Sequence, residues 1–67
     1  MEAYQQRVAE ERNQLIARRD KLNTFLSDDV FKTLDDSEQK RMIVQCGLMN
    51  AYVDILDQRI AAFPQFR

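Results

Sequence analysis

The segment MIVQCGLMNAYVDILDQRIAAF, residues 42–63, decides the fold because its apolar residues recur at helical spacing. Alternating steps of four and three residues connect one apolar row: Met42, Cys46, Met49, Val53, Leu56, Ile60 and Phe63. A row with this period lies along one side of a helix, so it predicts a long amphipathic helix with a buried side. Pro64 lacks a backbone N–H, and we therefore expect the helix to end at Phe63.

A second apolar row lies beside the first. It consists of Val44, Leu48, Tyr52 and Ile55. Together the two rows form an apolar arc that is wider than one partner helix can cover, and uncovered apolar surface is typical of an interface. We therefore expect the chain to self-associate.

Acidic residues mark the beginning of this helix. Asp35 and Glu38 have the three-residue spacing of a capping box, and negative charge suits the N-terminal end of a helix. The pattern thus predicts a helix over residues 36–63 and a connector over residues 27–35. We expect the connector to contain a short helical segment, with Phe31 and Leu34 closing the end of the hairpin.

Upstream of the connector, nothing interrupts a first helix over residues 3–26. Two neighbouring rows could face its partner, and each includes charged residues. One row is Tyr4, Val8, Glu11, Leu15, Arg18, Leu22 and Phe25, and the other is Val8, Arg12, Leu15, Arg19, Leu22 and Leu26. Because the two long helices have similar lengths, we expect them to pack antiparallel. The predicted fold is all-α: a single helical-hairpin domain, residues 1–67, that assembles as a homo-oligomer.

Composition excludes several kinds of chemistry. The 67 residues include no His and one Cys, so neither an internal disulfide, a zinc site nor a Ser-His or Cys-His catalytic pair can form within one chain. Neighbouring carboxylates such as Asp28 and Asp29 are explained by helix capping or solvation. We expect a protein that binds rather than catalyses, with no metal and no cofactor.

Charge and hydropathy limit the kinds of partner that we expect the chain to bind. A net charge of −1 does not favour bulk binding of DNA or RNA. No apolar run approaches the roughly 18 residues that span a bilayer, and Met1 is followed directly by polar sequence. We therefore expect a cytoplasmic protein without membrane contact.

The first helix carries the candidate site. Aromatic and cationic residues recur along one flank of this helix: Tyr4, Arg7, Arg18, Lys21 and Phe25. Ring faces combined with cationic donors are what a protein needs to stack a base and hold a phosphate. The alternative is that the three cations pair with Glu11 and Asp20 on a solvated surface.

The order of residues along the chain resembles a known family. The resemblance is carried by Tyr4-Gln5-Gln6-Arg7-Val8, Glu11, Leu15, Lys21-Leu22, Phe25-Leu26, Phe31, Leu34, Met49, Tyr52, Ile55-Leu56 and Arg59-Ile60-Ala61. In this order they are similar to the phage anti-CBASS cyclic-oligonucleotide sponges, whose helical hairpin is shared with anti-Thoeris sponges.

The resemblance implies a phage-encoded protein of the host cytoplasm that binds cyclic di- or trinucleotides without cleaving them, so that bacterial CBASS effectors stay inactive. It also implies a homo-oligomer, with a hexamer as the suggested state. It places Tyr4 on a base and Arg7 and Lys21 on phosphates. Arg18 or Arg19 stands where many relatives favour lysine, and Cys46-Gly47 where they favour acidic or polar residues, which leaves the preferred nucleotide open.

Two other functions remain open from the residues. A structural or adaptor hairpin could bind another protein through the second apolar row. A regulator of a nucleic-acid enzyme could use the basic flank of the first helix.

Overall fold

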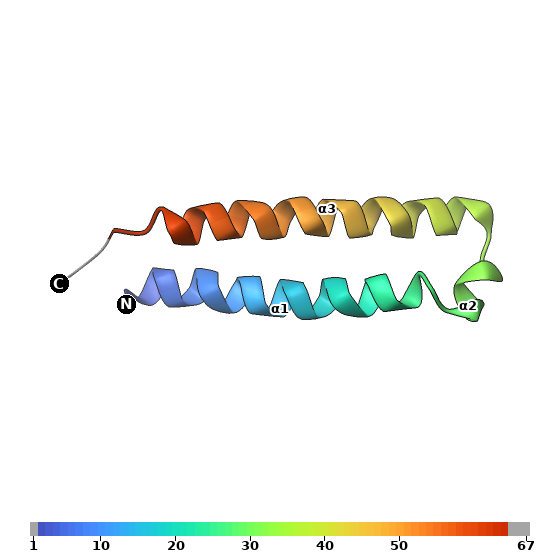
Figure 1. Ribbon diagram of the computed structural model, residues 1–67, viewed down its shortest axis with the longest axis horizontal. Helices are drawn as coiled ribbons and strands as arrows, with labels where there is room; N and C mark the ends of the chain where they lie inside the picture. The colour runs from blue at the N-terminus through green and yellow to red at the C-terminus, as the bar shows by residue number, and fades with distance from the viewer. Residues whose placement is uncertain (1, 65–67) are drawn as a thin grey trace.

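The computed structural model describes residues 2–64, and this part of the chain forms three helices and no strand. Helix α1 (Ala3–Phe25) and helix α3 (Asp36–Ala61) lie side by side and antiparallel (Figure 1). The short helix α2 (Asp29–Lys32) lies at the end where the chain turns, and the beginning of α1 and the end of α3 lie at the opposite, open end. The expected all-α hairpin of two long helices with a short helical connector is confirmed.

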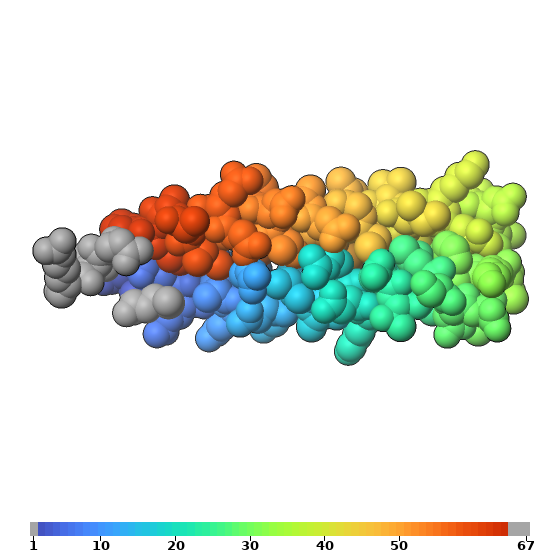
Figure 2. Space-filling model, viewed as in Figure 1, coloured from blue at the N-terminus to red at the C-terminus, as the bar shows by residue number. Residues whose placement is uncertain are grey.

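The molecule is a rod two helices across. Its principal extents are 54 × 14 × 14 Å, and the space-filling view shows the same elongated outline (Figure 2). Its radius of gyration is 15.6 Å, whereas a compact domain of this length has about 11 Å. Each long helix therefore has a single neighbour over most of its length.

Helix α1 begins with a reciprocal cap. The backbone N–H of Glu2 donates to the side-chain oxygen of Gln5 at 2.9 Å, and the Glu2 side chain accepts from the Gln5 backbone. Gln5 is 3% exposed, which makes it the one buried polar residue of the described chain. A capping box satisfies backbone donors that have no partner within the helix, so it fixes where α1 starts.

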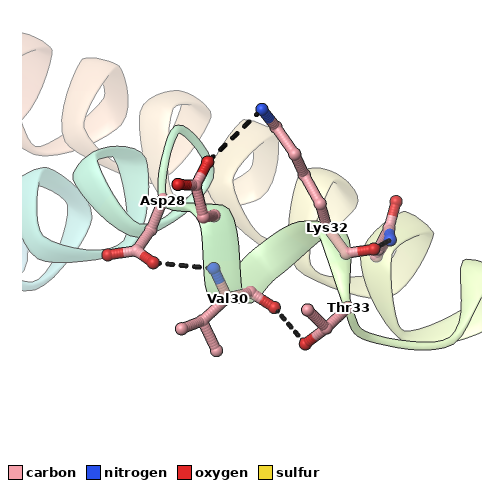
Figure 3. Close-up of polar contacts among 6 residues, drawn as sticks. Asp28, Val30, Lys32 and Thr33 are labelled. Atoms are coloured by element: carbon pink, nitrogen blue, oxygen red, sulfur yellow. Dashed lines mark hydrogen bonds and ion pairs between the residues drawn. The ribbon is translucent and has the colours of Figure 1, made fainter.

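The connector is held by short polar contacts (Figure 3). The carboxylate of Asp28 accepts from the backbone N–H of Val30 at 2.8 Å and caps α2. The hydroxyl of Thr33 donates to the Val30 carbonyl at 2.6 Å. The Nζ atom of Lys32 lies 3.6 Å from Oδ1 of Asp29 and forms an ion pair with it. These contacts satisfy the ends of a four-residue helix that could not persist by itself.

Helix α3 begins at Asp36 as expected, but the predicted capping box is wrong. The side chain of Asp35 makes no capping hydrogen bond, and Glu38 pairs with Arg41 at 3.0 Å. Instead, the side-chain amide of Gln39 donates to the Leu34 carbonyl at 2.9 Å and so ties the connector to α3. At the other end α3 stops at Ala61, two residues before the expected end.

The core confirms the apolar row of α3 as the buried one. All seven members of that row are buried or half-buried, and Leu56 has no exposed surface. Val53 and Leu56 pack with Val8 and Leu15 of α1 as the central cluster. Ile16, Met49, Ile60 and Phe63 surround this cluster.

Of the two candidate rows of α1, the one with Arg12 and Arg19 is the row that faces α3. These arginines are half-buried, whereas Glu11 and Arg18 are exposed. Arg12 lies at the helix interface because its guanidinium pairs with Asp57 of α3. Arg19 pairs with the neighbouring Asp20 at 3.1 Å. Both charged groups thus reach a carboxylate while their aliphatic stems cover the core.

Aromatic rings close both ends of the rod. At the connector, the buried Phe31 packs edge-to-face on Phe25 with 6.1 Å between ring centroids, and Leu34 is half-buried. At the open end, Tyr4 packs edge-to-face on Phe63 at 5.7 Å. None of the helices described is both long enough and apolar enough to cross a membrane.

Replacing Leu56 by Ala should lower the free energy of unfolding by about 2–5 kcal/mol, because the side chain is fully buried and a cavity would remain. Urea unfolding followed by circular dichroism at one fixed protein concentration measures this loss. The matched control is Val30→Ala, which trims an exposed side chain in the connector and should change stability by less than about 0.5 kcal/mol. Equal stability of the two variants would contradict this packing.

Candidate ligand-binding face

One side of the hairpin is defined by a contact between its helices. The hydroxyl of Tyr52 on α3 donates to the carboxylate of Glu11 on α1. Residues three, four or seven positions from either one lie on the same side of their helix. We call this side the Glu11–Tyr52 face; it includes Tyr4, Arg7, Arg18, Leu48, Ile55 and Arg59. Lys21 and Phe25 follow Arg18 at helical spacing along the same flank of α1.

Tyr4 stands at the open end with its ring partly accessible. The residue is 45% exposed, and its ring packs edge-to-face with the ring of Phe63. The Tyr4 hydroxyl accepts a hydrogen bond from the side-chain amide of Gln5 at 3.5 Å. Since Gln5 also caps α1, the position of the tyrosine is coupled to the start of the helix. The accessible ring surface is suitable for stacking on a base.

The three cations of the α1 flank are exposed and form no ion pair within residues 2–64. Among the described residues, Arg7, Arg18 and Lys21 have no carboxylate within 4.0 Å. The two acids considered as partners are engaged elsewhere: Glu11 accepts from Tyr52, and Asp20 pairs with Arg19. The alternative in which these cations pair with Glu11 and Asp20 is therefore not the arrangement seen.

Phe25 has a second role. Its half-buried ring packs edge-to-face on Phe31 with an interplanar angle of 89° and so belongs to the closed end of the rod. A ring engaged in this way presents only part of its surface to a ligand. Phe25 is therefore better suited to border a site than to act as a free stacking platform.

The predicted site residues form two groups along α1. Arg7 and Arg18 are eleven positions apart, or about 16 Å at 1.5 Å per residue. Tyr4 and Phe25 are separated by about 31 Å on the same scale. One group, Tyr4 and Arg7, lies near the open end, and the other, Arg18, Lys21 and Phe25, lies toward the connector. A single hairpin does not bring the five residues into one pocket.

Arg59 is a cation that the flank pattern of α1 did not include. Arg59 lies between Tyr52, which contacts Glu11, and Phe63, which follows α3 and contacts Tyr4. Arg7 lies between the matching positions on α1, so the two arginines occupy about the same level of the rod. Arg59 is exposed and has no carboxylate within 4.0 Å among the described residues. Combining the rows of both helices would have found it.

An apolar stripe forms the α3 part of this face. It comprises Val44, Leu48, Tyr52 and Ile55 and is called the α3 stripe below. Its members are 46–66% exposed, so the second apolar row of the sequence is indeed left uncovered by α1. Gly47 lies beside the stripe, and a Cβ added there would meet nothing within 4 Å. Nothing in the hairpin itself therefore requires glycine at this helical position.

Other reactive groups are few in the part of the chain described. Residues 2–64 hold no cluster of three His, Cys, Asp or Glu side chains arranged for a metal ion. The thiol of Cys46 is free and buried in the α3 row. The chemistry that the exposed face offers is recognition: aromatic rings, guanidinium and ammonium donors, and apolar surface.

Comparison with known proteins adds a family and a relative. The model of the family described as Sequestin matches residues 2–62. A relative from Enterobacteria phage T4, described as an uncharacterized 7.5 kDa protein in the denB-rIIB intergenic region, is 40% identical over 63 residues. This alignment covers 94% of the chain and 98% of the relative. No solved structure matches.

Proposed function

Because this chain belongs to the Sequestin family, we propose that it binds cyclic di- or trinucleotide second messengers without cleaving them. The proposed biological role is that of a phage-encoded sponge, which keeps such messengers from activating CBASS effectors in the host cytoplasm. The family name indicates sequestration without naming what is sequestered, and the relative is a phage protein. The nature of the ligand is therefore argued from the residues.

The observation that carries this proposal is the set of free cations on the α1 flank. Arg7, Arg18 and Lys21 lie exposed without an acidic partner in the described chain, on a protein whose net charge is −1. Such local donors favour a small anion over long nucleic acid, which requires an extended basic surface. The accessible Tyr4 ring near Arg7 adds a surface on which a base can stack.

A complete pocket requires more than one copy of the chain. The open-end group and the connector-end group of α1 are about 16 Å apart, as measured from Arg7 to Arg18. Two hairpins lying side by side in opposite directions would bring the open-end group of one copy to the connector-end group of the other. We therefore place the nucleotide between subunits, with Tyr4 on a base and Arg7 and Lys21 on phosphates.

The exposed surface supports self-association. The chain exposes 5317 Å², while a compact monomer of its mass exposes about 4,450 Å². The excess, roughly 900 Å², is similar to the ~800 Å² that each partner buries in a standard protein interface. The α3 stripe supplies apolar surface for this contact. A homo-oligomer, with a hexamer as the state to test first, is therefore part of the proposal.

The α3 stripe also favours a second candidate function. An uncovered apolar row on a helix can receive another protein, and the hairpin would then act as an adaptor. The two functions differ in what the purified protein binds: the sponge takes up nucleotides, whereas the adaptor takes up none.

Native mass spectrometry of the purified protein, alone and with an equimolar panel of cyclic di- and trinucleotides, tests the proposal. We expect a discrete homo-oligomer that carries intact nucleotide, and the released ligand should be unchanged on chromatography. An oligomer that takes up no member of the panel would refute the sponge and favour the adaptor.

Reversing charge at Lys21 tests the site. The variant Lys21→Glu should retain its helical circular dichroism and lose at least tenfold in nucleotide affinity by calorimetry, because a carboxylate would face the phosphates. The matched control, Lys32→Glu, reverses the charge of an exposed lysine in the connector and should leave affinity within about twofold. Unchanged affinity in Lys21→Glu would remove this residue from the site.

A charge in the α3 stripe tests assembly. Leu48 is 66% exposed in the hairpin, so Leu48→Glu should leave the fold intact. If the stripe is the interface, the buried glutamate would disfavour association, and light scattering should report a smaller mass. Val30→Glu makes a similar change in the connector and should retain the mass of the parent protein. An unchanged mass for Leu48→Glu would place the interface elsewhere.

A further inference from the structure

Glu11 lies where it could block the proposed site. It follows Arg7 by four positions on α1, a spacing at which a carboxylate and a guanidinium meet on a helix surface. An Arg7–Glu11 pair would occupy donors that a phosphate needs. Glu11 is thus an acid that the site has to keep away from its own cation, as is Glu10 at three positions from Arg7.

The structure shows Glu11 directed across the helix interface instead. Its carboxylate accepts a hydrogen bond from the hydroxyl of Tyr52, while Arg7 has no carboxylate within 4.0 Å among the described residues. A hydrogen bond to a charged acceptor is stronger than one between neutral groups. The phenol therefore competes with Arg7 for the same carboxylate.

The core holds Tyr52 in the position from which it reaches Glu11. Tyr52 directly precedes the buried Val53, and Val53 packs with Val8 and Leu15 of α1. Helical spacing places Glu11 and Arg12 on opposite sides of the row formed by Val8 and Leu15. The Arg12–Asp57 ion pair bridges the two helices on the other side of that row.

We propose that Tyr52 is a positioning residue for anion binding: its hydroxyl holds the Glu11 carboxylate across the interface and so leaves the Arg7 guanidinium free for a phosphate group. This role rests on the proposed function. In each hairpin the hydroxyl of Tyr52 would thus act on Glu11, whereas its ring contributes to the α3 stripe.

The first test needs no ligand. In Tyr52→Phe the ring remains but the donor is lost, so Glu11 should turn to Arg7 and shift the side-chain Nε–Hε signal of Arg7 in a heteronuclear NMR spectrum. Adding Glu11→Gln to this variant removes the competing charge and should return the signal close to its position in Glu11→Gln alone. Asp57→Asn, which breaks the other bridge between the helices, is the control and should leave the Arg7 signal in place.

The second test measures affinity for cyclic di-AMP, used as the probe, by calorimetry. Tyr52→Phe should weaken binding about twofold, the effect of one ion pair at this helical spacing. The double variant with Glu11→Gln should recover the affinity of the parent protein or exceed it. A purely structural role for Tyr52 would give a loss that Glu11→Gln does not rescue.

The two proposals fail separately. An Arg7 signal that is the same in the parent protein and in Tyr52→Phe would overturn the positioning role, whatever the protein binds. Absence of nucleotide binding by the parent protein would instead overturn the sponge, and a shifted Arg7 signal would still show that Tyr52 controls Glu11.

Discussion

Burial of one apolar row on each of two antiparallel helices is the contact on which the rest of the structure depends. In a rod two helices across, each helix can cover only one side of its partner. Leu56 lies within that contact and is the one large side chain described that is fully buried. The remaining apolar surface of α3 stays exposed because no third element reaches it.

This constraint links stability, assembly and the candidate site. A hairpin of this size has a small core, so association between copies is the available way to bury more apolar surface. The same shape spreads the cations of α1 along its length, where no single copy can gather them around one small ligand. If the chain acts as a sponge, folding and ligand capture therefore both depend on neighbouring copies. Tyr52 contributes to both, because its ring belongs to the α3 stripe and its hydroxyl contacts Glu11.

The fold could be predicted from periodicity because helix formation is local and the α3 row is uninterrupted. The buried row of α1 could not, since arginine interrupts one candidate row and glutamate and arginine the other. Arg12 of the buried row pairs with Asp57, which lies 45 positions away in the sequence. Sequence spacing also found the flank of Tyr4, Arg7, Arg18, Lys21 and Phe25, but it did not show that Glu11 accepts a hydrogen bond from Tyr52 of the other helix. Both contacts join the two helices, and a pattern within one helix does not contain them.

The two ends of the rod are closed by different means. At one end the chain itself joins the helices through α2, with the Phe25–Phe31 contact and the Gln39 hydrogen bond to the Leu34 carbonyl. At the other end the contact of Tyr4 with Phe63 joins the first turn of α1 to the residues that follow α3. Helix ends that are held by few contacts open most readily. An anion bound by both Arg7 and Arg59 would bridge α1 and α3 at this weaker end. Such an anion would act as a second connector and would hold together the end of the hairpin that the chain itself leaves unjoined.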